Sequence, residues 1–302
     1  MWTVEEKFVR SGELRLWTER CGDPGAPTVF LVMGTATQGI GWPDEFVEAL
    51  VDAGRQVIRY DHRDTGRSDC VDFAANPYAL GDLAADAVAV LDGHGVPTAH
   101  VVGTSLGGAI GQWLAVHRPA RVRTLTALAS SPMGNDPGPA WARAFAGQPP
   151  VAGELPPPTA RFLAHVLASA AAPRETYAER VDADVRTWRV LNGDVLPFDE
   201  DAARRFVERC HARARDYAAA LQHDLAGRRF ADDRRAALSA VTAPTLVLHG
   251  EQDPLFPPAH GAALAAQIPG ARLAVVPGMG HHPFFAPGLT GRIAELVVEH
   301  TR

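Results

Sequence analysis

The pentapeptide at residues 103–107, GTSLG, places a serine where a nucleophile could lie. A short β-branched apolar run, residues 100–102, precedes it and predicts a buried strand, and residues 106–114 predict a helix. Glycines on both sides suit a turn too tight for side chains, which would push the Ser105 hydroxyl into a cleft. The pattern therefore predicts a nucleophile elbow, with Ser105 attacking a carbonyl carbon.

A serine hydroxyl becomes a good nucleophile when a base takes its proton and an acid orients that base. Asp253 follows a predicted strand at residues 245–249, and His281 follows another at 271–276. One crossover helix and one strand separate the two, so both loops would lie beside Ser105 at the carboxyl edge of a parallel sheet. We therefore predict a catalytic triad of Ser105, Asp253 and His281.

Two neighbouring residues compete for the roles of acid and base. Glu251 lies nearer its strand than Asp253, but an Asp followed by Pro254 fits such a loop better. His282 adjoins His281, and adjacent residues of an extended loop point in opposite directions, so we expect His281 to reach the serine. No cluster of Cys, His or Asp at ligand spacing accompanies this pair, so we expect no metal.

Ester hydrolysis also needs amide N–H donors that stabilise the negative oxygen of the tetrahedral intermediate. Leu106 follows the nucleophile and begins a helix, whose dipole would help its amide in this role. We expect the second donor to be the amide of Thr35, in the loop after a predicted strand at residues 28–33, with Gly34 providing the turn.

The segment at residues 61–69, DHRDTGRSD, is dense in charged and turn-forming residues and follows a predicted strand at 56–60. Acidic and basic side chains alternate closely within it. We expect these charged groups to pair with one another and to fix the loop, without a part in the chemistry.

The elements that carry these loops alternate between strand and helix, which is typical of a parallel sheet with right-handed crossovers. A hairpin at residues 8–19 would open the sheet, which should have about eight strands. The alternation stops between residues 133 and 238, where helices are expected around residues 162–172, 174–190 and 201–220. We predict a core domain of residues 1–132 and 239–302, with residues 133–238 inserted as a helical cap.

The composition of the chain limits the classes of protein to which it can belong. A chain of 302 residues with 46% hydrophobic content can bury one large core. The net charge of −6 comes with no basic block, so we expect neither a nucleic-acid nor a membrane partner. The chain shows no leader pattern and no long apolar run, which favours the cytoplasm, where its three cysteines would be reduced thiols.

Five segments carry a resemblance to a known family: residues 31–34, 41–46, 57–68, 83–93 and 277–281. With these segments and the predicted triad in view, the chain resembles the α/β-hydrolase superfamily, and more narrowly aclacinomycin methylesterase and its relatives from aromatic polyketide pathways. The resemblance implies the same triad and places the two oxyanion amides on Thr35 and Leu106. The family relative has Gly and Met at these two positions, but both act through the backbone.

The resemblance implies hydrolysis, without a cofactor, of a methyl ester on an anthracycline-like polyketide. The predicted cap matches less well, so the substrate-binding residues are open; candidates there are Trp141, Phe145 and Trp188. The same triad could serve another small apolar ester, a lactone or a carbon–carbon bond beside a ketone. A ligand-binding protein without activity is the remote alternative, and the sequence makes no prediction of oligomeric state.

Overall fold

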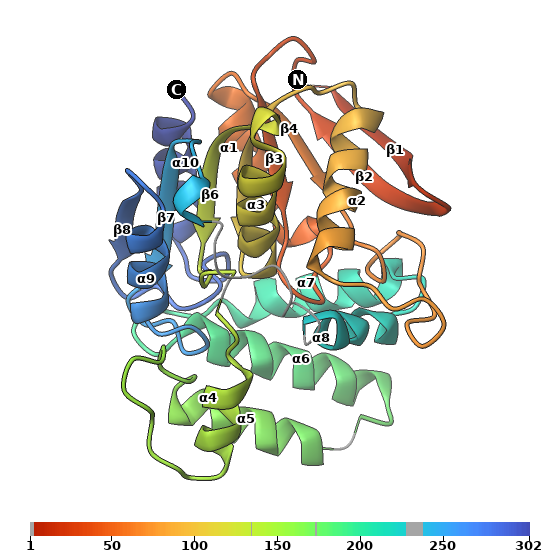
Figure 1. Ribbon diagram of the computed structural model, residues 1–302. Coiled ribbons are helices and arrows are strands. Elements are labelled where there is room, and N and C mark those ends of the chain that lie inside the picture. The colour runs from red at the N-terminus through yellow and green to blue at the C-terminus, as the bar shows by residue number, and fades with distance from the viewer. Residues whose placement is uncertain (1–2, 134, 173, 228–237) are drawn as a thin grey trace.

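The computed structural model describes residues 3–133, 135–172, 174–227 and 238–302. An eight-stranded sheet with the order β1-β2-β4-β3-β5-β6-β7-β8 forms its centre (Figure 1). β1 pairs antiparallel with β2, and β2 with β4, whereas the other neighbours are parallel. The predicted fold class is therefore confirmed. The strands are β1 Val4–Ser11, β2 Leu14–Cys21, β3 Thr28–Val32, β4 Gln56–Tyr60, β5 Ala99–Thr104, β6 Val122–Leu128, β7 Thr245–Gly250 and β8 Arg272–Val276.

Helices cover both faces of the sheet. α2, α3 and α9 contribute to the hydrophobic cluster on one face, and α1 and α10 to the cluster on the other. The helices are α1 Asp44–Asp52, α2 Leu80–Gly93, α3 Leu106–His117, α4 Gly138–Phe145, α5 Ala160–Ala171, α6 Tyr177–Asn192, α7 Glu200–Arg213, α8 Gln222–Gly227, α9 Ala259–Gln267 and α10 Leu289–His300.

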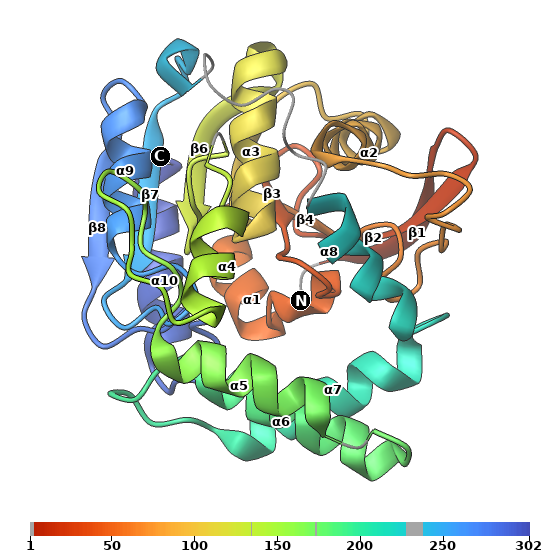
Figure 2. The ribbon, with the colours of Figure 1, turned by 60° about the horizontal axis from the view of Figure 1, so that its bottom comes forward.

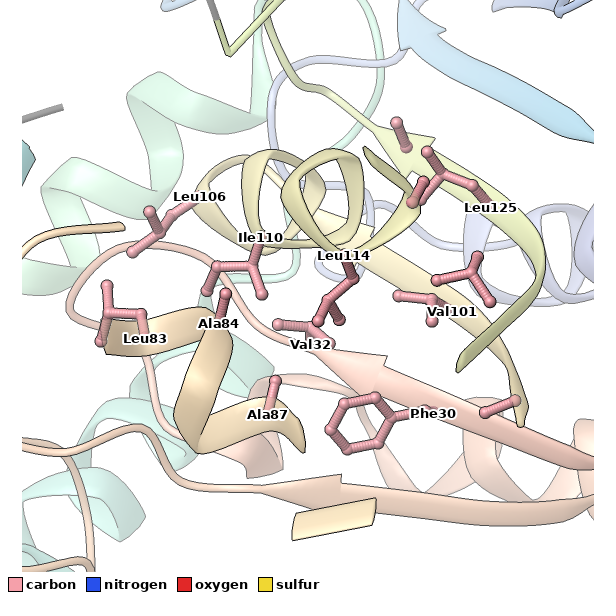
Figure 3. Packing of buried hydrophobic residues seen from close by; sticks show 14 of the residues in the cluster. Phe30, Val32, Leu83, Ala84, Ala87, Val101, Leu106, Ile110, Leu114 and Leu125 are labelled. Carbon is pink, nitrogen blue, oxygen red and sulfur yellow. The ribbon is translucent and has the colours of Figure 1, made fainter. Parts of the chain in front are cut away.

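Successive residues of a strand belong alternately to the two hydrophobic clusters, because their side chains point to opposite faces of the sheet. In β3, Phe30 and Val32 belong to the cluster with α2 and α3, while Val29 and Leu31 belong to the cluster with α1 and α10. Figure 3 shows the first cluster, in which Ile110 of α3 lies near Ala84 of α2 and Val32 of β3. Full burial of each large apolar side chain stabilises the fold by roughly 1.5–3 kcal/mol. This packing holds α3 against the sheet and thereby fixes the loop that precedes it.

The segment between β6 and β7, which we name the insertion, is helical, and no strand is found in its described residues. Its helices lie together along one end of the sheet (Figures 1 and 2). Side-chain caps begin three of them: Thr159 accepts from the amide of Phe162 at α5, Thr176 from Glu179 at α6, and Asp199 from Ala202 at α7. The insertion includes residues 228–237, which lie outside the described residues, and the division into core and cap stays a prediction.

Two details of the insertion differ from the sequence expectation. α4 was not expected, because it is short and begins at Gly138-Pro139, two residues with poor helix propensity. The helix expected over residues 201–220 ends at Arg213, after which Ala214 is extended. The amide of Arg215 then donates to the carbonyl of Gly66 at 2.8 Å, so a contact with the core ends the helix.

No helix in the described part of the chain is long and apolar enough to cross a membrane. The three cysteines are free: Cys21 and Cys210 are buried, and Cys70 is exposed. Burial raises the pKa of the Cys21 thiol to about 12, so this group stays protonated, and its Sγ donates to Glu19 Oε1 at 3.4 Å.

Candidate active site

Ser105 lies between the end of β5 and the start of α3, as the sequence predicts. Its backbone has φ 52° and ψ −116°, a conformation that L-residues rarely adopt and that costs about 1–3 kcal/mol. Three hydrogen bonds hold it there: its amide donates to the carbonyl of Leu128 at 2.9 Å, and its carbonyl accepts from Ser130 Oγ at 2.9 Å and from the amide of Ala109 at 3.2 Å. Such a strained strand-to-helix turn is the geometry of a nucleophile elbow.

The glycines around Ser105 are required by close backbone contacts. A Cβ at Gly103 would overlap the carbonyl of Gly107, and a Cβ at Gly107 would overlap the carbonyl of Val32 on β3. A Cβ at Gly108 would lie 2.6 Å from Cβ of Ser130. α3 can therefore approach the sheet only because these positions lack side chains.

Gly107→Ala is expected to destabilise the protein by roughly 3 kcal/mol or more, because its methyl group would meet fixed backbone rather than a flexible side chain. Gly291→Ala in α10 is the matched control. A Cβ at Gly291 meets nothing within 4 Å, and alanine there should stabilise the helix by about 0.5–1 kcal/mol. Urea unfolding measures both changes. Equal midpoints for the two variants would contradict the steric account of the elbow.

Asp253 and His281 form a buried pair at the carboxyl ends of β7 and β8. Asp253 Oδ2 lies 2.8 Å from His281 Nδ1, and only 2% of the Asp253 surface is exposed. The other carboxylate oxygen, Oδ1, accepts from the amides of Leu255 and Phe256 at 2.9 and 2.8 Å. The carboxylate is thus fixed from both sides, and it orients the ring so that Nε2 is the nitrogen available to a nucleophile's proton.

The two rival residues have other contacts. Glu251 Oε2 accepts from the amide of Gly278 at 3.0 Å, so this carboxylate braces the turn after β8. The His282 ring lies against Trp188, with centroids 4.5 Å apart, and stacks on Phe285 at 4.9 Å. Neither ring nitrogen of His282 has a hydrogen-bond partner among the described residues. Within those same residues, no group of three His, Cys, Asp or Glu side chains could hold a metal ion.

The pair and Ser105 share one edge of the sheet. β5, β6, β7 and β8 are consecutive neighbours, and the amide of Ala129 after β6 donates to the carbonyl of Leu248 in β7 at 2.8 Å. The Ser105 hydroxyl makes no hydrogen bond to His281 in the described part of the structure. Such contacts are commonly loose in structures without substrate and tighten when substrate binds. The roles of the three residues remain predictions.

The loop after β3 lies directly beside the serine. A Cβ at Gly34 would be 3.3 Å from Cβ of Ser105. Leu106 occupies the first position of α3, where an amide has no partner within the helix. The backbone hydrogen bonds of the described residues also include none from the amide of Thr35. Both amides are therefore available as donors, although their role as an oxyanion hole is still a prediction.

Two histidines that sequence reasoning did not assign to the site hold this loop. The His62 ring contacts the carbonyl of Met33 at 2.9 Å, and the amide of Ala36 donates to Nδ1 of His223 at 3.0 Å. His62 belongs to the charged segment, whose position after a strand was a usable signal. A single histidine such as His223, far along the chain in the insertion, gave none.

The three candidate substrate-binding aromatics lie in two groups. Trp141 and Phe145 of α4 are in contact, with ring centroids 6.4 Å apart, and Phe145 is 40% exposed. Trp141 also lines a small hollow of about 30 Å³ beside His260. Trp188 of α6 belongs instead to the aromatic cluster around His282. The structure therefore does not bring all three together.

His282 should make the protein sensitive to acid. Burial lowers its pKa to about 3, and the neighbouring charge of His281 acts in the same direction. The unfolded chain takes up this proton near pH 6.5, so the group has no effect on stability above that pH and destabilises the fold progressively below it. His282→Phe should weaken the loss of stability between pH 6 and 4.5 by up to about 1.4 kcal/mol per pH unit. Urea unfolding across this range measures it; slopes equal to wild type would contradict it.

The charged segment at residues 61–69 has partners that the sequence did not indicate. Asp61 forms an ion pair with Arg213 at the end of α7, with 2.9 Å between Nη1 and Oδ2. Arg63 pairs with Asp86 of α2 at 2.6 Å, and Asp69 pairs with Arg15 of β2 at 3.2 Å. The expectation that these groups pair mainly with one another is therefore wrong. A tight turn holds them side by side, so their side chains extend outward to other elements.

The insertion also contacts the loop that carries His281. The carbonyl of Leu191, near the end of α6, accepts from the amide of His281 at 2.7 Å. Gly280 permits this contact, because a Cβ there would overlap the carbonyls of Leu191 and Asn192. The position of the histidine backbone is thus set partly by the insertion.

A family model and the related proteins of known function point to the same family. Residues 27–286 match the model of the alpha/beta hydrolase fold family. The chain is 43% identical to rhodomycin D methylesterase DnrP of Streptomyces peucetius and 41% identical to rhodomycin D methylesterase DauP of Streptomyces sp. strain C5. Each comparison covers 91% of both chains.

Solved structures agree on the fold. The 2-hydroxy-6-oxo-6-phenylhexa-2,4-dienoate hydrolase of Rhodococcus sp. strain RHA1 superposes with a TM-score of 0.75 at 21% identity, covering 99% of both chains. These findings confirm the resemblance expected from the sequence, and with it the prediction of a hydrolase. The chain belongs to the α/β-hydrolase fold family.

Proposed function

We propose that this protein is a serine hydrolase that cleaves a small-molecule carboxylic ester through an acyl-enzyme. Ser105 is the nucleophile, His281 the general base, and Asp253 the group that orients the base. The observation that carries the proposal is the buried hydrogen bond between Asp253 and His281 at the sheet edge where the strained turn presents Ser105.

The chemistry follows from these positions. His281 Nε2 takes the proton of Ser105 Oγ as Oγ bonds to the ester carbonyl carbon, and the carbonyl π electrons move to its oxygen. The amides of Thr35 and Leu106 donate to that negative oxygen. The C–O bond to the alcohol then breaks, and His281 returns its proton to the leaving oxygen. Water, activated in the same way, hydrolyses the acyl-enzyme and restores Ser105.

We infer that the ester is a methyl ester on an anthracycline-like aromatic polyketide. The support is the identity of 43% and 41% to two rhodomycin D methylesterases over 91% of this chain. The insertion acts as a cap that selects the substrate, because its helices lie at the sheet end that carries the triad loops (Figure 2). Trp141 and Phe145 of α4 supply apolar area for a flat ring system, whereas Trp188 packs in the separate aromatic cluster around His282.

The test is direct. The purified protein is incubated separately with an anthracycline methyl ester, a simple aromatic methyl ester, a lactone and a β-diketone, and products are followed by mass spectrometry. Release of methanol from the anthracycline ester, with slower turnover of the simple ester, is the expected result. No turnover of any methyl ester would exclude the proposal, and turnover of the β-diketone alone would assign carbon–carbon bond cleavage instead.

A further inference from the structure

His223 of α8 uses both ring nitrogens against the core, although it lies in the insertion. The amide of Ala36 donates to Nδ1 at 3.0 Å, and Nε2 lies 2.9 Å from the carbonyl of Arg63. Because an amide can only donate and a carbonyl can only accept, the ring must be neutral with its proton on Nε2. Burial lowers the pKa of His223, which favours this neutral form, and only 2% of the residue is exposed.

The amide that His223 holds belongs to an unusual turn. Ala36 has φ 55°, a left-handed conformation that a residue with a side chain adopts at a cost. Its amide is part of the peptide group that directly follows Thr35. Two further hydrogen bonds close the turn: Thr37 Oγ1 donates to the carbonyl of Thr35 at 3.0 Å, and the Thr37 amide donates to the carbonyl of Gly34 at 3.3 Å.

The surroundings fix the ring of His223 in turn. The His62 ring, which contacts the Met33 carbonyl just before the loop, meets it edge-on with centroids 5.7 Å apart. Tyr78 meets it edge-on at 6.4 Å. The loop that carries Thr35 is therefore held at its start by His62 and at its left-handed residue by His223, and the two rings support each other.

We propose that His223 is a positioning residue for the oxyanion hole: by holding the Ala36 amide, it aims the Thr35 amide at the developing negative oxygen. The inference rests on the proposed function, since it gives the Thr35 amide a catalytic role. It also means that the oxyanion hole is complete only while α8 of the insertion is docked on the core. His223 makes no contact with the reacting atoms in this account and acts through the backbone.

Substitution of His223 by asparagine or by glutamine tests its two hydrogen bonds one at a time. In His223→Asn, Oδ1 takes the place of Nδ1 and can still accept from the Ala36 amide, while the bond to the Arg63 carbonyl is lost. In His223→Gln, the amide nitrogen takes the place of Nε2 and can still donate to Arg63, while the acceptor for Ala36 is lost. Each variant removes one contact to the core, so a purely structural role would affect both alike.

The variants are compared with wild type by p-nitrophenyl acetate hydrolysis, thermal unfolding and affinity for a trifluoromethyl ketone, whose adduct with Ser105 bears a negative oxygen. His223→Gln should lower kcat by about 10- to 100-fold with little change in KM, and should weaken ketone binding by a similar factor. His223→Asn should stay within about threefold of wild type in both. Similar unfolding temperatures for the two variants are part of the expected result.

Equal loss of kcat in both variants, or no loss in His223→Gln, would overturn the inference. A fall in kcat that follows only the unfolding temperature would overturn it too. Labelling of wild-type Ser105 by a serine-directed phosphonate keeps the two proposals apart. If the wild type is neither labelled nor active, the proposed function fails; if it is both, and the variants behave alike, the role of His223 alone fails.

Discussion

Ser105→Ala is expected to lower kcat for ester hydrolysis by about 10⁶-fold and to leave the protein folded. Alanine keeps the Cβ in its strained backbone position, and the lost hydroxyl has no hydrogen-bond partner in the described part of the structure. The unfolding temperature should therefore change little, while the attacking atom is gone. Steady-state kinetics on a hydrolysed ester and a thermal melt measure the two effects.

The same variant has a chemical control. A serine-directed phosphonate should add one label to the intact wild-type protein, at Ser105, and none to Ser105→Ala. Ser130 is an internal comparison, because its hydroxyl donates to the carbonyl of Ser105 and faces backbone instead of a base. Labelling of any residue other than Ser105, or turnover by the alanine variant near the wild-type rate, would overturn the assignment of the nucleophile.

Asp253→Asn is expected to lower kcat by about 10⁴-fold. The asparagine Oδ1 can still accept from the amides of Leu255 and Phe256, so the loop should keep its shape. Its NH₂ group would face His281 Nδ1 and favour the tautomer with the proton on Nε2, which is the wrong form for a base that must accept a proton there. Kinetics with the same ester, and a thermal melt to show retained folding, measure the change.

Glu251→Gln is the matched control for this acid. The glutamine oxygen can still accept from the amide of Gly278, which is the hydrogen bond that Glu251 makes in the structure. We expect kcat within about threefold of wild type, because this side chain has no contact with the histidine in the described hydrogen bonds. If instead Glu251→Gln lost activity and Asp253→Asn kept it, the roles of the two carboxylates would have to be exchanged.

The sheet and the loops at its edge were predictable from sequence because their signals are local. Each buried strand is a short apolar run that ends at a turn, and the position of Asp253 and His281 directly after two such runs was enough to expect them at one edge. The hairpin was placed correctly about Gly12, with φ 56°, although its strands extend further, from Val4 to Cys21. These local signals for strands and turns therefore predicted most of the sheet.

Contacts between distant segments were not predictable in the same way. The partner of Asp61 is Arg213 and the partner of the Ala36 amide is His223, both far along the chain in the insertion. Nothing in the spacing of a lone arginine or histidine indicates which loop it will meet. The wrong expectation for the charged segment has the same origin, since neighbours in sequence were preferred over neighbours in space.

The contact between Leu191 and His281 has a consequence for engineering the specificity of this protein. Exchanging the insertion for that of a relative would also disturb the loop that carries His281, because the His281 amide donates its 2.7 Å hydrogen bond to an insertion carbonyl. A transplanted segment must bring a helix end with a carbonyl at the same point and must leave room for Gly280. A chimera in which the exchanged segment ends inside α6, before Leu191, keeps the native Leu191 carbonyl. It should therefore retain more activity than a chimera in which the whole segment between β6 and β7 is exchanged.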